Sequence, residues 1–466
     1  MRCLFLILMV AVAATSRAAS EFLGVFMNSQ KIGYSSSESF NDQSFQSDTR
    51  SESYSVMNMA LLGTDMKIEI WTKSWSKNQK PRRMESKMSS AGRTQTVIAD
   101  FKSKTIELVV DNAGSITKKT LAIPTDGEIV DDAINTVWAE GSAVGSKRAF
   151  YVLDPMTASL VKNEIKLLGQ KKTILQGKEI SANAVQLSEP RSTMTAYFSS
   201  KGDLIKLDGP MGIEMIPMSE AEAKGDAPKS SGSTDIGFSN AIRPNRSLGD
   251  VTQLKSLKLR VTGKDLSRLP SDHRQVVARK GDSWVITLSP EKPNAKETIA
   301  SAIKEVPSWT KPSLNIPSDD ASMQRLARTI IGKEKTVVGA SERVRQYVMK
   351  IMLPNAGIGI IRDAREVLKT REGVCRDYAI LTATLMRAVS IPSRVAAGLV
   401  YQDGQYYYHA WVEAWDGKKW FGVDSTRPGS VGMGHIKLAQ GSVEDAFTFT
   451  FLGNVTMEVL DAKRRP

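Results

Sequence analysis

The chain has 466 residues, of which 41% are hydrophobic and 24% are charged, and its net charge is +13. This composition is typical of a globular protein that forms its own apolar cores, and it excludes a disordered chain or a small scaffold held together by disulfides. The basic residues are spread along the sequence and no nucleic-acid-binding motif is present, so we expect no nucleic-acid partner. A solvated basic surface is the simplest interpretation of the charge, and peripheral contact with an anionic surface is the alternative.

The N-terminus has the pattern of an export signal. Arg2 supplies a positive charge, residues 4–14 form an uncharged apolar run, and Ala18, Ala19 and Ser20 are small enough for cleavage. An uncleaved membrane anchor is the alternative, but the run is too short to span roughly 30 Å of hydrocarbon. We therefore expect residues 1–20 to be a signal peptide and the mature protein to be exported, soluble, and periplasmic or extracellular.

Cysteine usage singles out one residue. The sequence contains Cys3 and Cys375, and removal of the signal peptide leaves only Cys375, so an internal disulfide is excluded. A lone thiol in an oxidising compartment is a liability unless it has a use, although a buried structural cysteine is the alternative.

Residues 21–220 are predicted to form a β-rich domain. Residues 67–75, KIEIWTKSW, alternate polar and apolar side chains as a half-buried strand does, and residues 105–110 and 193–198 are similar. The segment 131–138 is predicted to form a short helix. Together these elements indicate a large, curved antiparallel sheet or sandwich.

The next two segments are a linker and a second set of strands. Residues 221–247 are rich in Gly, Ser, Pro and charge, which is typical of a linker. Residues 248–310 return to strand-like runs, at 255–262 and 284–288, and are predicted to form a small β domain.

Residues 311–466 begin with a helical pattern and end with strands. Helices are expected at 319–331 and 341–352, with Ser318 and Ser341 as N-caps, and a third helix should start at or just after Cys375. Strands are then expected at 394–401, 407–415 and 420–423, and the Asp-Gly pairs at 403–404 and 416–417 suit hairpin turns.

Three side chains in this last segment form a candidate catalytic set. Cys375 lies at a helix start, where free backbone N–H groups and the helix dipole favour the thiolate. His409 lies in a predicted strand and Asp424 at the end of the next one, so adjacent antiparallel strands can bring them side by side. A nucleophile, a base and a carboxylate that orients the base make up an acyl-transfer apparatus.

The same segment contains a series of short motifs in a fixed order. They are Gly373-Val374-Cys375 with Asp377-Tyr378-Ala379, Leu385-Met386-Arg387-Ala388, Ile391-Pro392-Ser393-Arg394, His409-Ala410-Trp411-Val412-Glu413, and Trp420 before Asp424-Ser425-Thr426. Together they resemble the core of transglutaminase-like enzymes, which have a papain-like fold of helices packed on an antiparallel sheet. The resemblance covers residues 310–460 and implies an α+β C-terminal domain behind β-rich antiparallel domains, with Cys375 as nucleophile, His409 as general base and acid, and Asp424 as its orienting group.

Two features of the animal transglutaminases are missing. No tryptophan lies between Trp309 and Cys375 to stabilise an oxyanion, and no acidic loop has the spacing of calcium ligands. We therefore expect no metal and no cofactor, with the backbone N–H of Cys375 as one oxyanion donor. Trp411 and Arg376 are weaker substrate-binding candidates, because Trp411 could wall the cleft and Arg376 could attract an acidic group.

These observations favour an exported cysteine peptidase or amidase that forms a thioester and then hydrolyses it. Transfer of the acyl group to an amine, as in a protein-glutamine gamma-glutamyltransferase, is the second interpretation. A non-catalytic envelope-binding scaffold is the third. For the enzyme, the expected partner is a protein or peptide substrate, associated with the cell envelope.

Overall fold

The computed structural model describes residues 20–61, 63–130, 143–189, 192–225, 235–263, 266–429, 431–447 and 455–465. Nearly all of the expected signal peptide, the expected helix at 131–138 and the centre of the expected linker lie outside these residues. The chain divides into two compact units: unit 1 is residues 1–239 with 357–360, and unit 2 is residues 240–356 with 361–466. Among the described residues, no helix combines the length and the apolar character that a membrane crossing requires.

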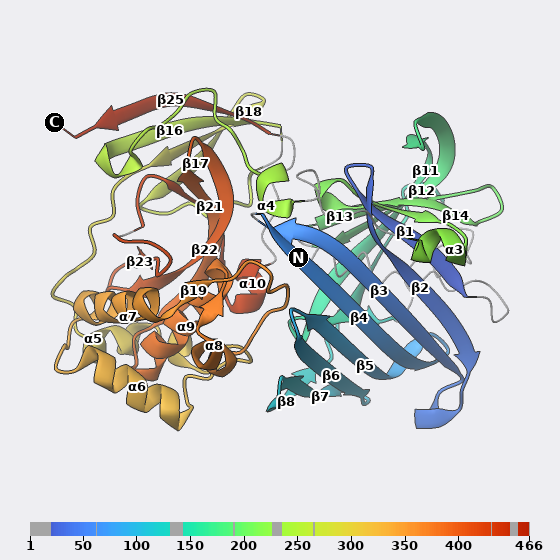
Figure 1. Ribbon diagram of the computed structural model, residues 1–466, viewed down its shortest axis with the longest axis horizontal. Coiled ribbons are helices and arrows are strands. Elements are labelled where there is room, and N and C mark those ends of the chain that lie inside the picture. Colours follow the sequence, from blue (N-terminus) through green and yellow to red (C-terminus); the bar gives the residue numbers. More distant parts are fainter. Residues whose placement is uncertain are drawn as a thin grey trace. The chain divides into compact units, whose positions relative to one another are not determined.

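Unit 1 is built almost entirely from antiparallel strands (Figure 1). Its short helices are η1 (Ser44–Gln46), η2 (Pro210–Gly212), α3 (Glu220–Lys224) and α4 (Ile236–Ser239). Its strands are β1 (Glu21–Met27), β2 (Gln30–Asn41), β3 (Thr49–Leu61), β4 (Thr64–Lys77), β5 (Lys80–Ser90), β6 (Arg93–Phe101), β7 (Thr105–Asn112), β8 (Ser115–Ala122), β9 (Glu128–Ile129), β10 (Lys147–Asp154), β11 (Ser159–Leu175), β12 (Lys178–Glu189), β13 (Ser192–Phe198), β14 (Leu204–Asp208) and β15 (Ile213–Pro217).

These strands form one sheet in the order β8-β7-β6-β5-β4-β3-β2-β1-β15-β14-β13-β12-β11-β10-β9. The strand order is thus two antiparallel meanders, β1 to β8 and β10 to β15, joined where β1 pairs with β15, and β9 adds to β10 in parallel. Short turns explain the meanders: Asn28 and Ser29 between β1 and β2, and Asn78 and Gln79 between β4 and β5, all have positive φ, as tight hairpin turns require.

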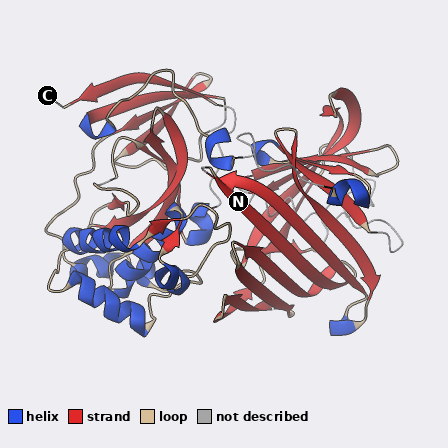
Figure 2. Ribbon diagram, viewed as in Figure 1, coloured by secondary structure: helices blue, strands red, loops and turns tan. Residues whose placement is uncertain are grey.

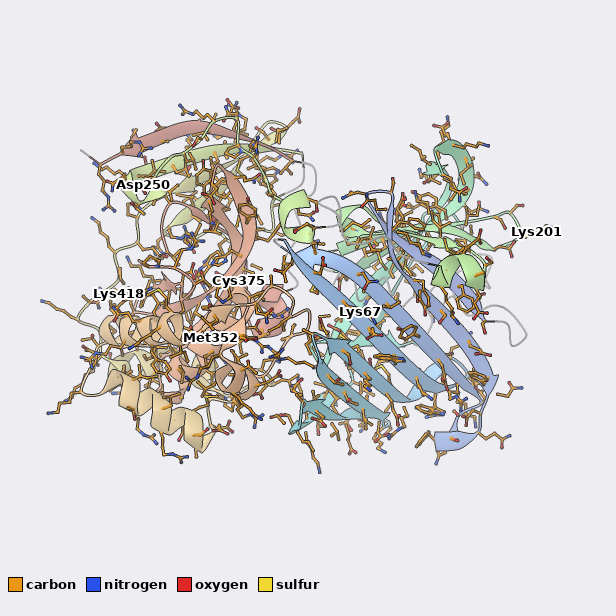
Figure 3. The ribbon with its side chains drawn as sticks, in the orientation of Figure 1. Lys67, Lys201, Asp250, Met352, Cys375 and Lys418 are labelled. Atoms are coloured by element: carbon orange, nitrogen blue, oxygen red, sulfur yellow. The ribbon has the colours of Figure 1, made fainter. Side chains whose placement is uncertain are left out.

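Strand β4 shows how the sequence produces this sheet. Met66, Ile68 and Ile70 are buried, whereas Lys67 between the first two is exposed. Figure 3 labels Lys67 on this strand. Successive strand residues point to opposite faces, so this alternation buries one face and leaves the other solvated. The strand expected at residues 67–75 is confirmed.

Unit 2 combines helices with two four-stranded sheets, β17-β18-β16-β25 and β23-β22-β21-β24 (Figure 2). Its helices are η4 (Val251–Gln253), α5 (Ile299–Glu305), η5 (Pro307–Thr310), α6 (Ala321–Ile331), α7 (Val337–Ile351), α8 (Ala364–Thr370), α9 (Cys375–Ala388) and α10 (Val443–Phe447). Its strands are β16 (Leu254–Thr262), β17 (Gln275–Lys280), β18 (Ser283–Leu288), β19 (Leu353–Pro354), β20 (Glu372–Gly373), β21 (Ser393–Gln402), β22 (Gln405–Trp415), β23 (Trp420–Val423), β24 (His435–Gly441) and β25 (Thr456–Arg464).

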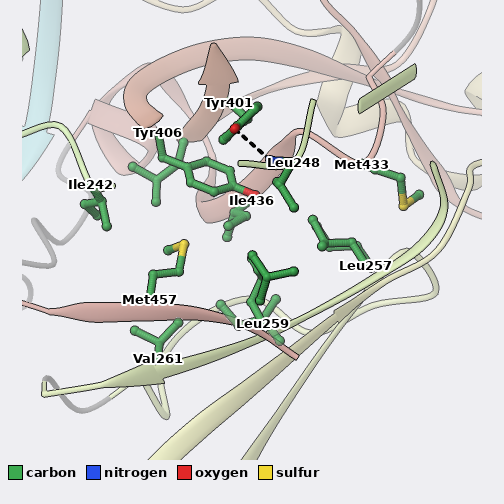
Figure 4. Close-up of a cluster of buried hydrophobic side chains, with 14 of the residues drawn as sticks. Ile242, Leu248, Leu257, Leu259, Val261, Tyr401, Tyr406, Met433, Ile436 and Met457 are labelled. Carbon is green, nitrogen blue, oxygen red and sulfur yellow. Dashed lines mark hydrogen bonds between the residues drawn. The ribbon is translucent and has the colours of Figure 1, made fainter. Parts of the chain in front are cut away.

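One apolar core joins the two sheets of unit 2. Leu257, Leu259 and Val261 of β16 pack with Tyr406 of β22 and Ile436 of β24 in this core (Figure 4). The strands that the sequence predicts as a small domain at 248–310 therefore share a core with the strands of the predicted C-terminal domain, and β25 completes their sheet.

The side of β22 that faces away from this core carries the candidate site. Tyr406 and Tyr408 pack into or against the core, so the alternation of strand residues directs His409 and Trp411 to the opposite side. Helix α9 packs against β22 and β21. The chain as a whole is β-rich, and the arrangement of helices on an antiparallel sheet belongs to unit 2.

The helices of unit 2 begin at other caps than the sequence suggests. Asp320, not Ser318, caps α6, because its carboxylate accepts bonds from the backbone N–H groups of residues 322 and 323. Thr336, not Ser341, caps α7, and Ser341 is buried inside that helix. Both true caps are also good N-cap residues, so composition alone does not choose between neighbouring candidates.

Candidate active site

Helix α9 begins at Cys375, with Val374 as its N-cap residue. Asp377, in the first turn, accepts a hydrogen bond from the backbone N–H of Val374 at 2.9 Å, which fixes the start of the helix. Cys375 is a free cysteine and is partly exposed. The residue therefore lies at the positive end of the helix dipole, which favours the thiolate.

A buried ion pair holds this helix start in place. Arg362 and Asp377 are both fully buried, and Arg362 Nε lies 3.2 Å from Asp377 Oδ1. Arg362 also donates to the carbonyl oxygen of Glu372, just before the helix. Gly373 leaves room for the pair, since a Cβ there would lie 2.5 Å from Asp377 Cβ and 2.8 Å from an Arg362 nitrogen.

His409 lies on β22 opposite Gly398 of β21, and it is buried. Its Nε2 is 2.8 Å from Asp424 Oδ2. Its ring also hydrogen-bonds to the Cys375 side chain, and because Nε2 is used by Asp424, Nδ1 is the nitrogen left for the sulfur. The imidazole thus stands between the thiol and the carboxylate.

The electrostatics of the pair favour a thiolate and an imidazolium. Burial alone would lower the pKa of His409, but the Asp424 carboxylate and the Cys375 side chain outweigh burial and raise the pKa to about 9. Burial also raises the pKa of the Cys375 thiol, yet the hydrogen bond and charge of His409, together with the backbone N–H of Ala410, bring it below its ordinary value. Each partner therefore stabilises the charged form of the other.

Asp424 follows β23 directly and is fully buried. Its Oδ1 accepts bonds from the backbone N–H of Thr426 at 2.9 Å and from the Thr426 hydroxyl at 2.7 Å. Burial favours the neutral acid, but His409 and His435 outweigh burial and hold the pKa of Asp424 well below its ordinary range. The group facing His409 is thus a carboxylate.

The model of the transglutaminase-like superfamily matches residues 324–425, a span that includes Cys375, His409 and Asp424. Residues 324–425 form a transglutaminase-like domain. The structure brings the three side chains of the sequence prediction together in this transglutaminase-like domain, in the order sulfur, imidazole, carboxylate.

Two curated proteins are similar to parts of the chain. A stretch of 70 residues is 41% identical to a protein-glutamine gamma-glutamyltransferase of Pseudomonas aeruginosa, which is 12% of this chain and 10% of that protein. A stretch of 115 residues is 27% identical to the uncharacterized protein ML0607 of Mycobacterium leprae, which is 23% of this chain and 40% of that protein. The matched stretches thus span about a tenth and two fifths of these relatives.

Two solved structures show a limited likeness to the chain. A putative cysteine protease from Cytophaga hutchinsonii has a TM-score of 0.34 at 20% identity, over 46% of this chain and 89% of its own. A β-barrel-like protein of domain family DUF1849 from Brucella abortus has a TM-score of 0.31 at 10% identity, over 42% of this chain and 93% of its own.

Two weaker site candidates take other places in the transglutaminase-like domain. Trp411 is only 1% exposed and lies between two imidazoles, with ring centroids 6.2 Å from His409 and 5.3 Å from His435. It therefore packs against both histidines, and its side chain is almost entirely covered. Arg376 is also buried, 3.9 Å from Asp377, so its charge is directed into the domain and not toward an acidic substrate group.

His435 is the residue that sequence reasoning missed. Its place in a glycine-rich segment of the sequence, after the strands of the candidate set, favours packing near the cleft over proton transfer. The structure makes it the first residue of β24, with Nε2 3.2 Å from Asp424 Oδ2. Gly398 permits this approach of β24, because a Cβ there would lie 1.9 Å from the carbonyl oxygen of Ile436. The available signal was that His435 is one of only three histidines in the chain.

His409, Asp424 and His435 have the side-chain types that bind metal ions. Among the described residues, His409, Asp424 and His435 place one ligand atom each within 4.8 Å of one another. However, the backbone N–H of Gly432 donates to His435 Nδ1 at 3.3 Å, which puts the ring proton on Nε2, the atom that a metal would need. Metal binding would force that proton onto Nδ1 against a backbone donor, so this donor set does not fit a resident metal ion.

Proposed function

We propose that this chain is an exported cysteine enzyme that cleaves amide bonds through a thioester on Cys375. The observation that carries the proposal is the position of His409, which contacts the thiol with one side of its ring and Asp424 with the other, at 2.8 Å. In this proposal Cys375 is the nucleophile, His409 the general base and acid, and Asp424 the group that orients the imidazole.

The first half of the reaction forms the thioester. The Cys375 sulfur attacks the amide carbonyl carbon, a C–S bond forms, and the developing oxyanion accepts the backbone N–H of Cys375 at the helix start. The C–N bond then breaks, and His409 gives its Nδ1 proton to the leaving nitrogen. Asp424 stabilises the imidazolium until that proton leaves.

The second half releases the acyl group. Neutral His409 takes a proton from water, the hydroxide attacks the thioester, and the C–S bond breaks to return the Cys375 thiolate and the imidazolium. We favour water as the acceptor because the cysteine is partly exposed. The substrate class that we propose is a protein or peptide of the cell envelope.

Transfer to an amine is the second candidate reaction. It is favoured by the 70-residue similarity to a protein-glutamine gamma-glutamyltransferase, although that stretch is only 10% of the relative. Incubation with a glutamine-containing peptide and a labelled primary amine separates the two reactions. Labelled peptide indicates transfer, whereas ammonia or cleavage products without label indicate hydrolysis, and Cys375→Ala should give neither.

Thiol labelling tests the enzyme against a non-catalytic scaffold without a known substrate. Iodoacetamide should modify Cys375 much faster than a free thiol at pH 6.5, because the nucleophile is the thiolate. His409→Ala should remove this excess, and His273→Ala, at a histidine outside the site, should keep it. Equal, slow labelling of all three proteins would favour the scaffold.

The export of the protein is proposed from the sequence of residues 1–20. Fractionation of cells that express the full chain should recover a shortened protein outside the cytoplasm. A chain that starts with Met followed by residue 21 should stay inside, and recovery of both chains in the cytoplasm at full length would contradict the proposal.

A further inference from the structure

One carboxylate in unit 2 serves two histidines. Asp424 Oδ2 lies 2.8 Å from His409 Nε2 and 3.2 Å from His435 Nε2, while Oδ1 is taken by Thr426. The mechanism above uses only the first of these bonds. The second imidazole, which is 4% exposed, therefore has a specific contact with the reaction machinery and no assigned purpose.

The backbone determines which way the second bond runs. Gly432 N–H donates to His435 Nδ1 at 3.3 Å, so Nδ1 is the acceptor and Nε2 carries the proton. Nε2 therefore donates to Asp424. Burial lowers the pKa of His435 to about 4, so this donor is neutral at pH 7 and adds no competing positive charge beside His409.

The surroundings hold His435 in this orientation. Arg274, which is 2% exposed, donates to the carbonyl oxygens of Gly432 at 3.3 Å and of His435 at 2.7 Å, and thereby fixes the short loop that precedes β24. Trp411 packs against the His435 ring edge to face at 5.3 Å. The His435 ring is thus fixed by Gly432 and Trp411, and a fixed donor can determine the position of its acceptor, Asp424.

The carboxylate of Asp424 has a further neighbour, the side chain of Arg427. Arg427 Nε lies 3.4 Å from the same Oδ2 and has no hydrogen-bond partner of its own. If the Nε2–H of His435 were removed, Oδ2 would be shared between the His409 imidazolium and the Arg427 guanidinium, with no neutral donor on the His435 side to hold it in place. The carboxylate would then move toward the guanidinium and away from the imidazole.

We propose that His435 is a positioning residue, which donates to Asp424 and so keeps that carboxylate on His409; the inference rests on the proposed cysteine chemistry. Its loss weakens the support of Asp424 for the imidazolium, and a less stable imidazolium gives less support to the Cys375 thiolate. The acid limb of thiol reactivity, which reports protonation of the thiolate, then moves to higher pH.

Other charged groups near these residues must be considered in any pH profile. These groups act on Asp424, Cys375 or His435, and the variants below leave all of them in place. They are Arg427 after β23, Arg345 on α7, Cys375 and Arg376 on α9, and Arg274 before β17.

The test measures the rate of iodoacetamide labelling of Cys375 against pH in the full chain. His435→Ala should shift the acid limb upward by about one pH unit, so that at any pH below the limb of both proteins its rate is roughly tenfold lower. His435→Gln, whose amide nitrogen can donate to Asp424, should stay close to the unchanged protein. His273→Ala is the matched control, because it removes a histidine of unit 2 that has no bond to Asp424.

Chemical rescue gives a readout that a merely structural role would not. His435 lines a cavity of about 490 Å³, together with Tyr401, Arg427 and Met433. Imidazole added to His435→Ala should enter this cavity, replace the missing donor and return the acid limb toward its original pH, with no effect on His435→Gln. If His435→Ala does not fold, His435→Met, which fills the space without a donor, takes its place in the pH comparison.

The outcomes separate this inference from the function on which it rests. If Cys375 of the unchanged protein labels no faster than a free thiol, the proposed function and the role of His435 both fail. If that labelling is fast but a folded His435→Ala or His435→Met has the same acid limb as the unchanged protein, only the role of His435 is overturned.

Discussion

The ion pair between Cys375 and His409 sets the pH range in which the site can work. In the proposed reaction the imidazolium protonates the leaving nitrogen, and its pKa of about 9 means that it persists well above pH 7. Turnover should therefore decline only as pH rises through about 9, when His409 loses its proton. We expect the alkaline limb of kcat near that value, and a limb near the ordinary histidine pKa of about 6.5 would contradict the ion pair.

Asp424→Asn should weaken the same ion pair from its other end. The amide removes the negative charge that outweighs burial at His409, so the pKa of the imidazole should fall and the thiolate should lose its partner. We expect turnover to drop on the order of 10²- to 10⁴-fold. Asp403→Asn is the matched control, because Asp403 lies in an exposed hairpin turn where asparagine tolerates the same positive φ. Similar losses in both variants would show a general effect on folding.

At the scale of single residues, sequence reasoning finds the three proposed catalytic residues but not the residues that hold them in place. Cys375, His409 and Asp424 follow from residue type and the order of predicted elements. For Trp411 the sequence leaves two interpretations open, packing on the sheet and a wall of the cleft, and its 1% exposure and its contact with the His409 ring favour packing. The role of His435 depends on the pairing of β24 with β21, which no local pattern encodes.

The start of α9 depends on a buried pair that can be tested separately from catalysis. Asp377→Ala removes both the carboxylate beside Arg362 and the acceptor for Val374 N–H, which leaves a buried guanidinium uncompensated. We expect a loss of about 3–5 kcal/mol in the free energy of unfolding of unit 2, measured by urea denaturation with tryptophan fluorescence. Glu458→Ala breaks the exposed pair with Arg260, where each side chain is 44% exposed, and should cost less than about 1 kcal/mol. Equal effects would refute the importance of burial.

The local sequence pattern predicts individual helices, strands and turns well, but it predicts less well the residues at which they begin and end. The Asp403-Gly404 turn has φ values of 48° and 88°, as an Asp-Gly hairpin predicts, and it joins β21 and β22 near the expected residues. Helix α7 begins at Val337 and not near Ser341, because Thr336 is the N-cap residue. The helix therefore starts several residues before the sequence shows a clear helical spacing of apolar residues. Caps are decided by side-chain bonds to nearby backbone, which several polar neighbours can offer.

The pairing of distant strands decides the architecture of the whole molecule. In unit 1 the first strand pairs with β15, and in unit 2 β16 pairs with β25, near the end of the chain. Alternation of polar and apolar residues predicts that these strands exist, but the same alternation suits many partners. The sequence therefore indicates a small domain at 248–310 but cannot show that the last strand of the chain completes its sheet.

This pairing leads to a prediction about unit 2 as an independent body. The three proposed catalytic side chains, His435 and the core that joins the two sheets all lie within residues 240–466. A chain of these residues alone should therefore fold and label at Cys375 within about threefold of the full-length rate, with the same acid limb.

A chain of residues 240–455 is the control, because it lacks only β25 and the residues around it. The loss of β25 exposes one edge of β16 and removes Met457 and Val459 from the core. Burial of each of these side chains contributes about 1.5–3 kcal/mol to the free energy of unfolding. We expect this shorter chain to be largely unfolded by circular dichroism and to label at the slow rate of a free thiol. If residues 240–466 behave in the same way, the compact unit is not an independent folding unit and residues 1–239 are needed to maintain the site. If residues 240–455 keep fast labelling, β25 is dispensable and the thiol environment depends on the helices and on β21–β24 alone.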